Sequence, residues 1–417
     1  MRNLRRSAIA AALALGTLAT AAGCSDGGSG SGSDTSSDQG TYTFWDPYPQ
    51  FDASSDWTKL VTGCGTKAGV TVKRTGMDTT DLGNKALLAA QQDNAPDVML
   101  VDNPVVSTLV SAGMLAKTDD VGLDTSKIQQ NIIGAGSQEG SAYGVPIGAN
   151  TLALFYNKDV LKAAGVDAAT LTDWDSLTAA LKKVKAAGKK GITFSAIGTE
   201  EGSFQFEPWF WGAQGDLKKL DDANGVDALT LWKDWVSDGL APHDVLQNTQ
   251  TTAWQEFATG EYAFGENGTW QLANAEKAGF DYGVISIPAR DGGAAPTPTG
   301  GEFVTVPVQS DTARYGTTKK IVDCLTSSEN LLSTDTTLSY VAPQADVQAK
   351  QVAENPKLEP WVAAVGTARG RTSDGLGTDY PVISEQLWGA VQSALSGSKS
   401  PEDALKAAQQ AAASKAG

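Results

Sequence analysis

Histidine is nearly absent from this sequence: His243 is the one histidine in 417 residues. A single histidine cannot build a multi-histidine metal site, and it leaves little room for a Ser-His-Asp catalytic arrangement. Because His243 follows Pro242 in a loop-like stretch, we expect it to have a structural role. We therefore expect no bound metal and no cofactor.

Basic residues are also scarce, since 32 Lys and Arg residues stand against 48 Asp and Glu residues. The formal net charge of −16 argues against nucleic acid as a partner and against direct adhesion to anionic lipid. It says little about a small neutral ligand.

Long apolar runs are absent apart from residues 8–22, and this run is too short to span a bilayer. A basic start before it (Arg2, Arg5 and Arg6) and small residues after it are typical of a secretory signal. The segment Ala21-Ala22-Gly23-Cys24 resembles a bacterial lipobox, in which the cysteine is lipidated and becomes the new N-terminus.

We therefore expect residues 1–23 to be a lipoprotein signal peptide and residues 24–40 to be a flexible tether rich in Gly and Ser. A lipid on Cys24 would be the only attachment to the membrane. The alternative is an ordinary secreted protein that has a cysteine at this place. The tether and the acidic composition favour the extracellular face of the cytoplasmic membrane, in a Gram-positive cell.

Only three cysteines are present, and if Cys24 carries lipid then Cys64 and Cys324 remain as an even pair. In an oxidising compartment such a pair predicts a disulfide. The alternative is two separate buried thiols.

Strand-like and helix-like segments alternate along the chain, which predicts an α/β fold. The run at 97–101 is largely apolar, as in a strand that is buried on both faces of a parallel sheet. The expected strands are 41–45, 70–74, 97–101, 191–196, 261–265 and 303–307. The expected helices are 56–67, 80–92, 104–113, 173–188, 228–237, 251–258 and 401–413.

Several short motifs occur in an order that is typical of one protein family. They are APDV (95–98), AGML (112–115), YGVP (143–146), LALFYNKDVL (152–161), DWDSL (173–177), FATGEYAFGENGTW (257–270) and YGV (282–284). Together with the last two helices, this set resembles the family 1 extracellular solute-binding proteins of bacterial ABC importers. The resemblance covers the chain from Thr41 onward.

The resemblance implies a type II periplasmic-binding-protein-like fold, in which two α/β lobes are joined by three hinge crossovers. We expect the crossovers near Gly148, Gly300 and Pro343, where glycine or proline separates periodic segments. The N-terminal lobe would then be 41–148 plus 299–342, and the C-terminal lobe 149–298 plus 343–417. The implied function is that of a monomeric, non-enzymatic lipoprotein that captures a sugar or oligosaccharide between its lobes and delivers it to an ABC permease.

Binding a sugar requires flat apolar rings against its C–H faces and fixed polar groups for its hydroxyls, because an unpaired buried hydroxyl costs about 1–3 kcal/mol. Trp270 matches the tryptophan of the family segment at 257–270 and is the first candidate for a stacking ring. Other candidates follow predicted strands, where ligands of open α/β sheets bind, or lie at the crossovers. Trp388 is on a late helix at an apolar spacing with Val391, so core packing is its alternative role. The full candidate set is Trp45, Asp46, Asp102, Asn103, Asn150, Glu207, Trp209, Trp211, Trp270, Gly301, Glu302 and Trp388.

Two alternatives remain open. The protein could bind a charged solute such as phosphate, a metal or a polyamine, although neither a phosphate-binding glycine loop nor clustered metal ligands are evident. It could also be a tethered glycoside hydrolase, which needs two opposed carboxylates. The candidate acids for that chemistry are Glu200, Glu201, Glu207, Glu256 and Glu266, and their spacing selects no pair.

Overall fold

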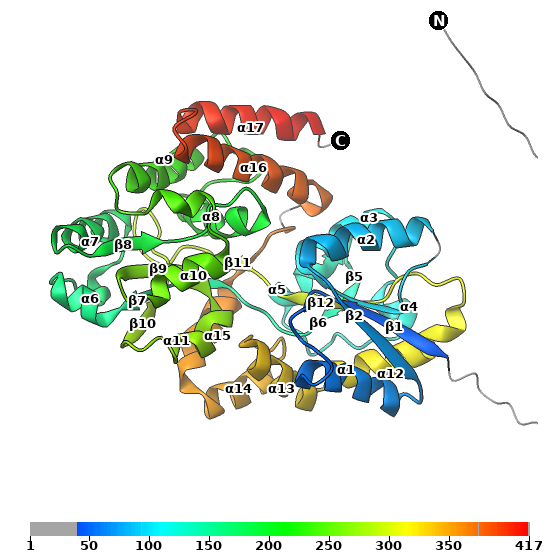
Figure 1. The fold of residues 1–417 in the computed structure, drawn as a ribbon. Coiled ribbons are helices and arrows are strands. Elements are labelled where there is room, and N and C mark those ends of the chain that lie inside the picture. The colour runs from blue at the N-terminus through cyan, green and yellow to red at the C-terminus, as the bar shows by residue number, and fades with distance from the viewer. Residues whose placement is uncertain (1–39, 93, 374, 416–417) are drawn as a thin grey trace, which may run out of the picture. The chain divides into compact units, whose positions relative to one another are not determined.

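The computed structural model shows strands and helices that alternate around two separate β-sheets (Figure 1). It describes residues 40–92, 94–373 and 375–415. The predicted signal peptide, the lipidation site Cys24 and all of the predicted tether except residue 40 lie outside the described residues. The mixed α/β class predicted from the sequence is confirmed.

The first sheet has five strands in the order β2-β1-β3-β12-β6. In it β1 runs parallel to β2 and β3, whereas β12 is antiparallel to β3 and β6. The sheet is therefore mixed rather than purely parallel, although β3 is buried as its apolar sequence predicts. Its strands are β1 (Thr41–Asp46), β2 (Thr71–Gly76), β3 (Val98–Asp102), β6 (Gly144–Pro146) and β12 (Glu302–Thr305).

The second sheet has four strands in the order β10-β7-β9-β8, with only β8 and β9 parallel. We call the part of the chain around the first sheet the first lobe and the part around this sheet the second lobe. The strands are β7 (Leu152–Asn157), β8 (Lys190–Thr193), β9 (Tyr262–Gly268) and β10 (Tyr282–Ile285). Two small sheets pair β4 (Ser137–Gln138) with β5 (Ser141–Ala142) and β11 (Pro298–Thr299) with β13 (Arg369–Gly370).

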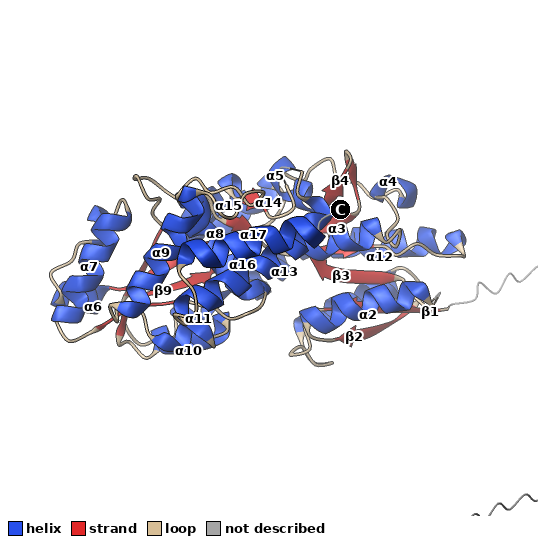
Figure 2. Ribbon diagram, turned by 90° about the horizontal axis from the view of Figure 1, so that it is seen from above, coloured by secondary structure: helices blue, strands red, loops and turns tan. Residues whose placement is uncertain are grey.

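Helices cover the sheets. Figure 1 shows β1 and β2 between α2 and α12, and Figure 2, seen from above, shows β3 between the same two helices. The helices along the first half of the chain are α1 (Asp56–Lys67), α2 (Thr79–Gln91), α3 (Asn103–Ser111), α4 (Thr118–Val121), α5 (Gln130–Ile133), α6 (Lys158–Ala163), α7 (Trp174–Ala186) and α8 (Glu200–Gly212). Those that follow are α9 (Ala223–Ser237), α10 (Gln250–Ala258), α11 (Leu272–Ala275), α12 (Tyr315–Leu325), α13 (Ser328–Leu338), α14 (Ala345–Glu354), α15 (Glu359–Thr367), α16 (Tyr380–Leu395) and α17 (Pro401–Lys415). The 3-10 turns are η1 (Gly134–Gly136), η2 (Ala168–Thr170), η3 (His243–Leu246), η4 (Thr269–Gln271), η5 (Thr312–Arg314), η6 (Pro356–Leu358) and η7 (Gly377–Asp379).

Local signals explain where several helices begin. Helix α7 begins after Asp173, whose carboxylate accepts from the backbone N–H of Ser176 while the Ser176 hydroxyl accepts from the backbone N–H of Asp173, a reciprocal capping box. Helix α1 has the predicted bounds, and Ser55 caps it through Thr58. Helix α8 is buried on almost every side, so its sequence carries no apolar stripe, and it is absent from the predicted helices.

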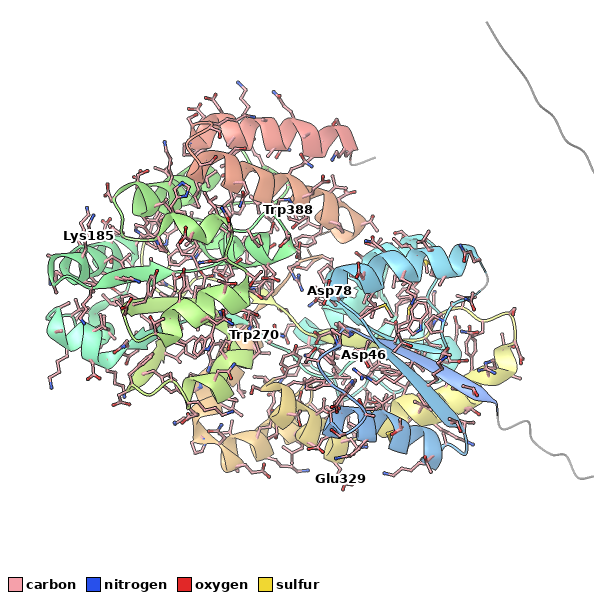
Figure 3. The ribbon with its side chains drawn as sticks, viewed as in Figure 1. Asp46, Asp78, Lys185, Trp270, Glu329 and Trp388 are labelled. Atoms are coloured by element: carbon pink, nitrogen blue, oxygen red, sulfur yellow. A yellow bond between two sulfur atoms is a disulfide. The ribbon has the colours of Figure 1, made fainter. Side chains whose placement is uncertain are left out.

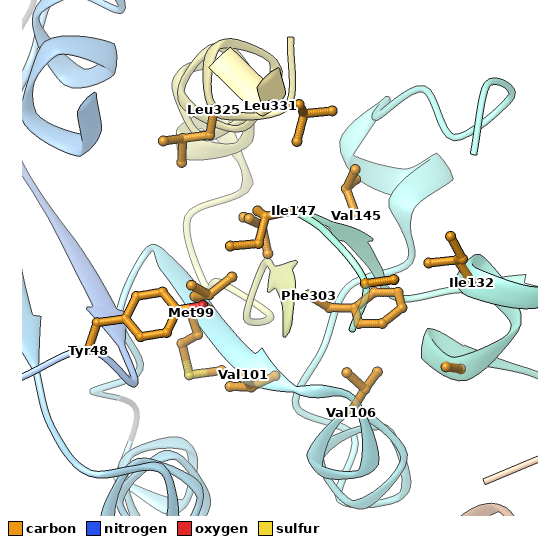
Figure 4. Packing of buried hydrophobic residues seen from close by; sticks show 14 of the residues in the cluster. Tyr48, Met99, Val101, Val106, Ile132, Val145, Ile147, Phe303, Leu325 and Leu331 are labelled. Carbon is orange, nitrogen blue, oxygen red and sulfur yellow. The ribbon is translucent and has the colours of Figure 1, made fainter. Parts of the chain in front are cut away.

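A continuous apolar core fills the first lobe between its sheet and helices (Figure 4). Met99 and Val101 of β3 lie beside Phe303 of β12, and Val106 of α3 and Leu325 of α12 close the layer from either side. Burial of each such side chain contributes about 1.5–3 kcal/mol, which holds the strand ends of this sheet in place.

Cys64 of α1 and Cys324 of α12 form a disulfide, with their Cα atoms 5.6 Å apart. This confirms the predicted pairing, and the alternative of two separate thiols is wrong. The bond joins two helices that pack against one another beside the first sheet, and its two cysteines are 260 residues apart in the sequence.

Candidate functional site

The segments that pass between the two sheets lie next to one another. Ala149 forms an isolated bridge with Val341, and Asn150 forms one with Gly300. The backbone N–H of Ala149 donates to Val341 at 2.8 Å, and that of Gly300 donates to Asn150 at 2.9 Å. These paired positions fall at or beside the three expected crossovers, while the lobe boundaries drawn from them stay a prediction.

The N-terminus of α3 places two of the candidate residues at this junction. The carboxylate of Asp102 caps the helix by accepting from the backbone N–H of Asn103 at 2.9 Å, and its side chain is 22% exposed. The buried side chain of Asn103 donates to the carbonyl of Thr299 at 2.8 Å. The first lobe thus presents a partly exposed carboxylate beside the crossover at Gly300.

The N-terminus of α8 brings a second carboxylate to the same place from the second lobe. Glu200 accepts from the hydroxyl of Tyr380 at 2.6 Å and also from Ser384, and its side chain is 35% exposed. The Tyr380 hydroxyl also lies 2.8 Å from the buried carboxyl of Glu207. Burial, followed by the charge of Glu200, raises the pKa of Glu207 well above its usual range.

Arg371 joins these two groups, and it is absent from the predicted site residues. Its Nη2 donates to Asp102 and to Asn103 at 2.9 Å each, and its Nη1 donates to Glu200 at 2.6 Å. Asp102 and Glu200 are 269 and 171 residues away in sequence, so no local pattern could reveal these pairs. The only sequence signal is a pair of arginines, Arg369 and Arg371, in a loop rich in glycine, serine and threonine.

Trp270 lies in the short turn η4 that follows β9, and its half-buried ring packs over the backbone of Gly268. The ring of Phe204 is 6.3 Å from it, and the guanidinium of Arg371 is 4.8 Å from the centre of the Phe204 ring. Figure 3 labels Trp270 in the second lobe, with Asp46 and Asp78 in the first. The ring of Phe204 therefore connects the ring of Trp270 with the polar cluster around Arg371.

Glu302 lies two residues after the crossover at Gly300. The hydroxyl of Tyr340 donates to its Oε1 at 3.3 Å, and Oε2 has no partner. Burial and then the nearby charge of Asp102 raise the pKa of Glu302 to about 7. At neutral pH this carboxyl is therefore ionised in some molecules and protonated in others, so it can either accept or donate a hydrogen bond.

Trp45 and Asp46 end β1, as predicted, but their settings differ. Asp46 is fully buried and accepts from Arg74 at 2.7 Å and from the indole N–H of Trp57 at 3.1 Å. Trp45 is half-buried, with the ammonium of Lys85 4.8 Å from its ring centre. The carboxylate of Asp46 is thus paired with groups of the protein itself and has no exposed surface for a ligand.

Glu207, Trp209 and Trp211 lie on α8, so they point in different directions, the outcome expected if this segment is helical. All three are almost fully buried. The indole N–H of Trp209 donates to Glu266 at 2.8 Å, and the ring of Trp211 lies 4.9 Å from the guanidinium of Arg369.

Asn150 is buried at the first crossover, and its Oδ1 occupies the space beside Gly300. Trp388 is half-buried on α16, close to Gly198. The structure thus gathers Asp102, Asn103, Asn150, Glu207, Trp270, Gly301 and Glu302 around Arg371 and the crossovers. It does not bring Trp45, Asp46, Trp209, Trp211 or Trp388 to Arg371, and ligand contact by any of the twelve stays a prediction.

A separate groove of about 740 Å³ runs along the edge strand β10, lined among others by Tyr282, Trp361, Lys357 and Glu276. Lys357 and Tyr282 both bond to Glu276, so these polar groups are already paired.

Within the described ranges, no group of three or more His, Cys, Asp or Glu side chains could hold a metal ion. None of the helices described combines the length and the apolar composition that crossing a bilayer requires.

The family model for bacterial extracellular solute-binding proteins matches residues 59–360. A binding protein of Brucella abortus (strain 2308) is 28% identical over 169 residues, which are 38% of this chain and 41% of the relative. The chain thus matches about two fifths of that relative's length.

Two further comparisons cover more of the chain. A maltooligosaccharide ABC transporter solute-binding lipoprotein of Streptococcus pneumoniae serotype 4 is 28% identical over 279 residues, 63% of each chain. The GacH receptor of Streptomyces glaucescens, solved unliganded and with acarbose, superimposes with a TM-score of 0.74. That comparison covers 89% of this chain and 97% of the receptor at 27% identity, and the predicted periplasmic-binding-protein-like fold is confirmed.

Proposed function

Because the chain belongs to the bacterial extracellular solute-binding protein family, we propose that it captures a maltooligosaccharide-type sugar between its lobes and delivers it to an ABC permease. The observation that carries the proposal is the half-buried indole of Trp270, which Phe204 connects to Arg371 and its two partly exposed carboxylates at the lobe junction. The family consists of binding proteins, so this is a binding protein rather than an enzyme, and the hydrolase alternative is set aside.

The chemistry of this junction suits an uncharged polyol. The indole of Trp270 offers an apolar face to the C–H groups of a pyranose, and Trp45 and Trp388 are the other half-buried rings of the candidate set. Asp102 and Glu200 offer partly exposed oxygen acceptors to sugar hydroxyls, and Glu302 lies near Asp102 with its Oε2 buried.

The remaining candidates would support the ligand-contacting residues from the interior of the protein. Their side chains, or the backbone in the case of Gly301, are buried and would hold the contacting residues in place. This supporting set is Asp46, Asn103, Asn150, Glu207, Trp209, Trp211 and Gly301.

Capture would involve a change in the separation of the lobes about the adjacent crossovers near 148, 300 and 343. The lobes would be 41–148 plus 299–342 and 149–298 plus 343–417. The disulfide would leave this motion free, because Cys64 and Cys324 are both in the first lobe.

The relative from Streptococcus pneumoniae is named a lipoprotein, which supports a lipid anchor at Cys24. In our proposal the protein is a monomer tethered to the extracellular face of a Gram-positive cytoplasmic membrane. Metabolic labelling with a palmitate analogue should mark the protein and should fail to mark Cys24→Ala.

A thermal-shift panel tests the ligand class, because a ligand that binds the native state alone stabilises it by about 2.7 kcal/mol at 100 times Kd. Maltose, maltotriose, maltotetraose and acarbose should include at least one compound that raises the Tm. Trp270→Ala should lose that shift while staying folded, which its own unfolding transition in the absence of ligand shows. A shift with spermidine, phosphate or another charged solute alone would contradict the proposal.

A further inference from the structure

Arg371 is a buried cation whose two acidic partners come from different lobes. Its side chain is 2% exposed, and its guanidinium reaches Asp102 at the start of α3 and Glu200 at the start of α8. These two helices flank different sheets and are connected through the crossovers. One side chain therefore connects the lobes directly, in addition to the backbone.

The setting of the guanidinium makes this connection specific. The ring of Phe204 lies 4.8 Å from it, Asn103 accepts from the same nitrogen as Asp102, and Nε has no partner. A cation buried this deeply is strongly unfavourable unless its partners stay in place. The planar fork of arginine can serve two carboxylates at once, which the single ammonium of a lysine cannot do in the same geometry.

We propose that Arg371 is a positioning residue that ties the separation of the two lobes to the geometry of the binding site. When the lobes have the separation seen in the structure, Arg371 pairs with both carboxylates. When they part, it loses at least one of them. The inference extends the proposed function, on which its sugar-binding consequence rests.

The same contacts connect Arg371 to the surfaces that would meet a ligand. Asp102 and Glu200 are 22% and 35% exposed, so part of each carboxylate faces away from Arg371. Phe204 carries the contact onward to the ring of Trp270, 6.3 Å away. A shift of the guanidinium would therefore disturb both acceptors and the ring that we propose for stacking.

Hydrogen exchange of the full-length chain tests the proposal without any ligand. In Arg371→Met, the backbone amides that bridge the crossovers, those of Ala149, Asn150, Gly300 and Val341, should exchange at least tenfold faster. Arg290→Met is the matched control, because Arg290 pairs with Asp227 and Asp291 inside the second lobe. It should leave these four amides unchanged.

The other variants separate positioning from plain stability. Asp102→Asn and Glu200→Gln each weaken one arm, and each should give a smaller acceleration at the same amides. Arg371→Lys should recover only part of the protection, because a single ammonium replaces the guanidinium and cannot reach both carboxylates in the same geometry. Uniform acceleration over both lobes, no acceleration at the crossovers, or full recovery with lysine would overturn the proposal.

Maltotriose titration of the same variants tests the consequence for the site. We expect at least a tenfold weaker Kd in Arg371→Met and no change in Arg290→Met. If wild type does not bind maltotriose or acarbose, the proposed ligand class fails, and the exchange data still decide the role of Arg371. Wild-type affinity in Arg371→Met would contradict the link to the site.

Discussion

The indole of Trp270 occupies the space that a side chain at Gly268 would need. A Cβ atom at position 268 would lie 2.0 Å from Cζ3 and 2.3 Å from Cη2 of the ring. The absence of a side chain at the end of β9 thus allows the six-membered part of the ring to approach the backbone closely. If Trp270 stacks on a sugar, the missing side chain at Gly268 determines how close to the end of β9 the stacking ring lies.

Gly268→Ala should therefore displace the Trp270 ring and weaken maltooligosaccharide binding at least tenfold, with a stability cost of about 1–3 kcal/mol from overpacking. Isothermal titration and chemical denaturation measure the two effects. Gly316→Ala is the control, because Gly316 is exposed on α12 with no atom within 4 Å of its Cβ position. Adding Trp270→Ala to Gly268→Ala should weaken binding little further, and full additivity would count against a shared mechanism.

Local sequence signals predicted much of the fold because they act over a few residues. Asp173 starts α7 by a capping bond to a residue three positions away, and Cys64 and Cys324 pair because no other described cysteine competes. Glycine and proline between periodic segments pointed to the places where the crossovers lie. Each of these inferences needed only composition, spacing or hydrogen-bond chemistry.

The candidate site was harder to predict because its chemistry depends on partners that are distant in sequence. Asp46 ends a strand as a ligand-binding carboxylate would, yet Arg74 neutralises it inside the first lobe. The segment with Glu207 and Trp209 is buried on almost every side, so periodicity could not orient it. Arg371 went unnoticed because both of its acidic partners lie more than 150 residues away.

Glu302 should make stability depend on pH. Its pKa is about 7 in the folded protein against an ordinary value of 4.5, so the folded state binds more protons than the unfolded state between these values. Stability should then fall as the pH rises from 4.5 to 7, by up to about 3 kcal/mol from this group. Glu302→Gln should flatten that part of the profile, measured by urea denaturation at each pH.

Glu329→Gln removes one exposed acid from α13 and controls for the loss of a charge. If Glu302→Gln follows the wild-type profile through this range, the raised pKa is wrong.

The disulfide should stabilise the first lobe without controlling ligand capture. The double variant Cys64→Ser/Cys324→Ser should lose about 2–5 kcal/mol, because the bond closes a long loop in the unfolded chain. Calorimetry of the double variant against wild type measures the loss. Affinity for maltotriose at a temperature where both are folded should differ less than threefold, and a larger difference would mean that the bond also restrains the lobes.

Gly301 should resist substitution for two reasons that a matched variant can separate. Its φ of +110° is rarely adopted by residues with a side chain, and a Cβ atom would lie 2.5 Å from the carbonyl oxygen of Gly148 at the neighbouring crossover. Gly113→Ala is the control, because Gly113 has a φ of +69° and open space around its Cβ position. That variant should lose about 1–2 kcal/mol from the backbone conformation alone.

Gly301→Ala should lose more than this, because the two crossovers must also move apart. Since the added atom meets backbone, the shift should reach Glu302 and Asn150 and change the affinity for maltotriose, which Gly113→Ala should leave unaltered. Denaturation and titration of the two variants side by side give both quantities. Equal losses of stability with equal affinities would show that the approach of Gly301 to Gly148 places no constraint on the junction.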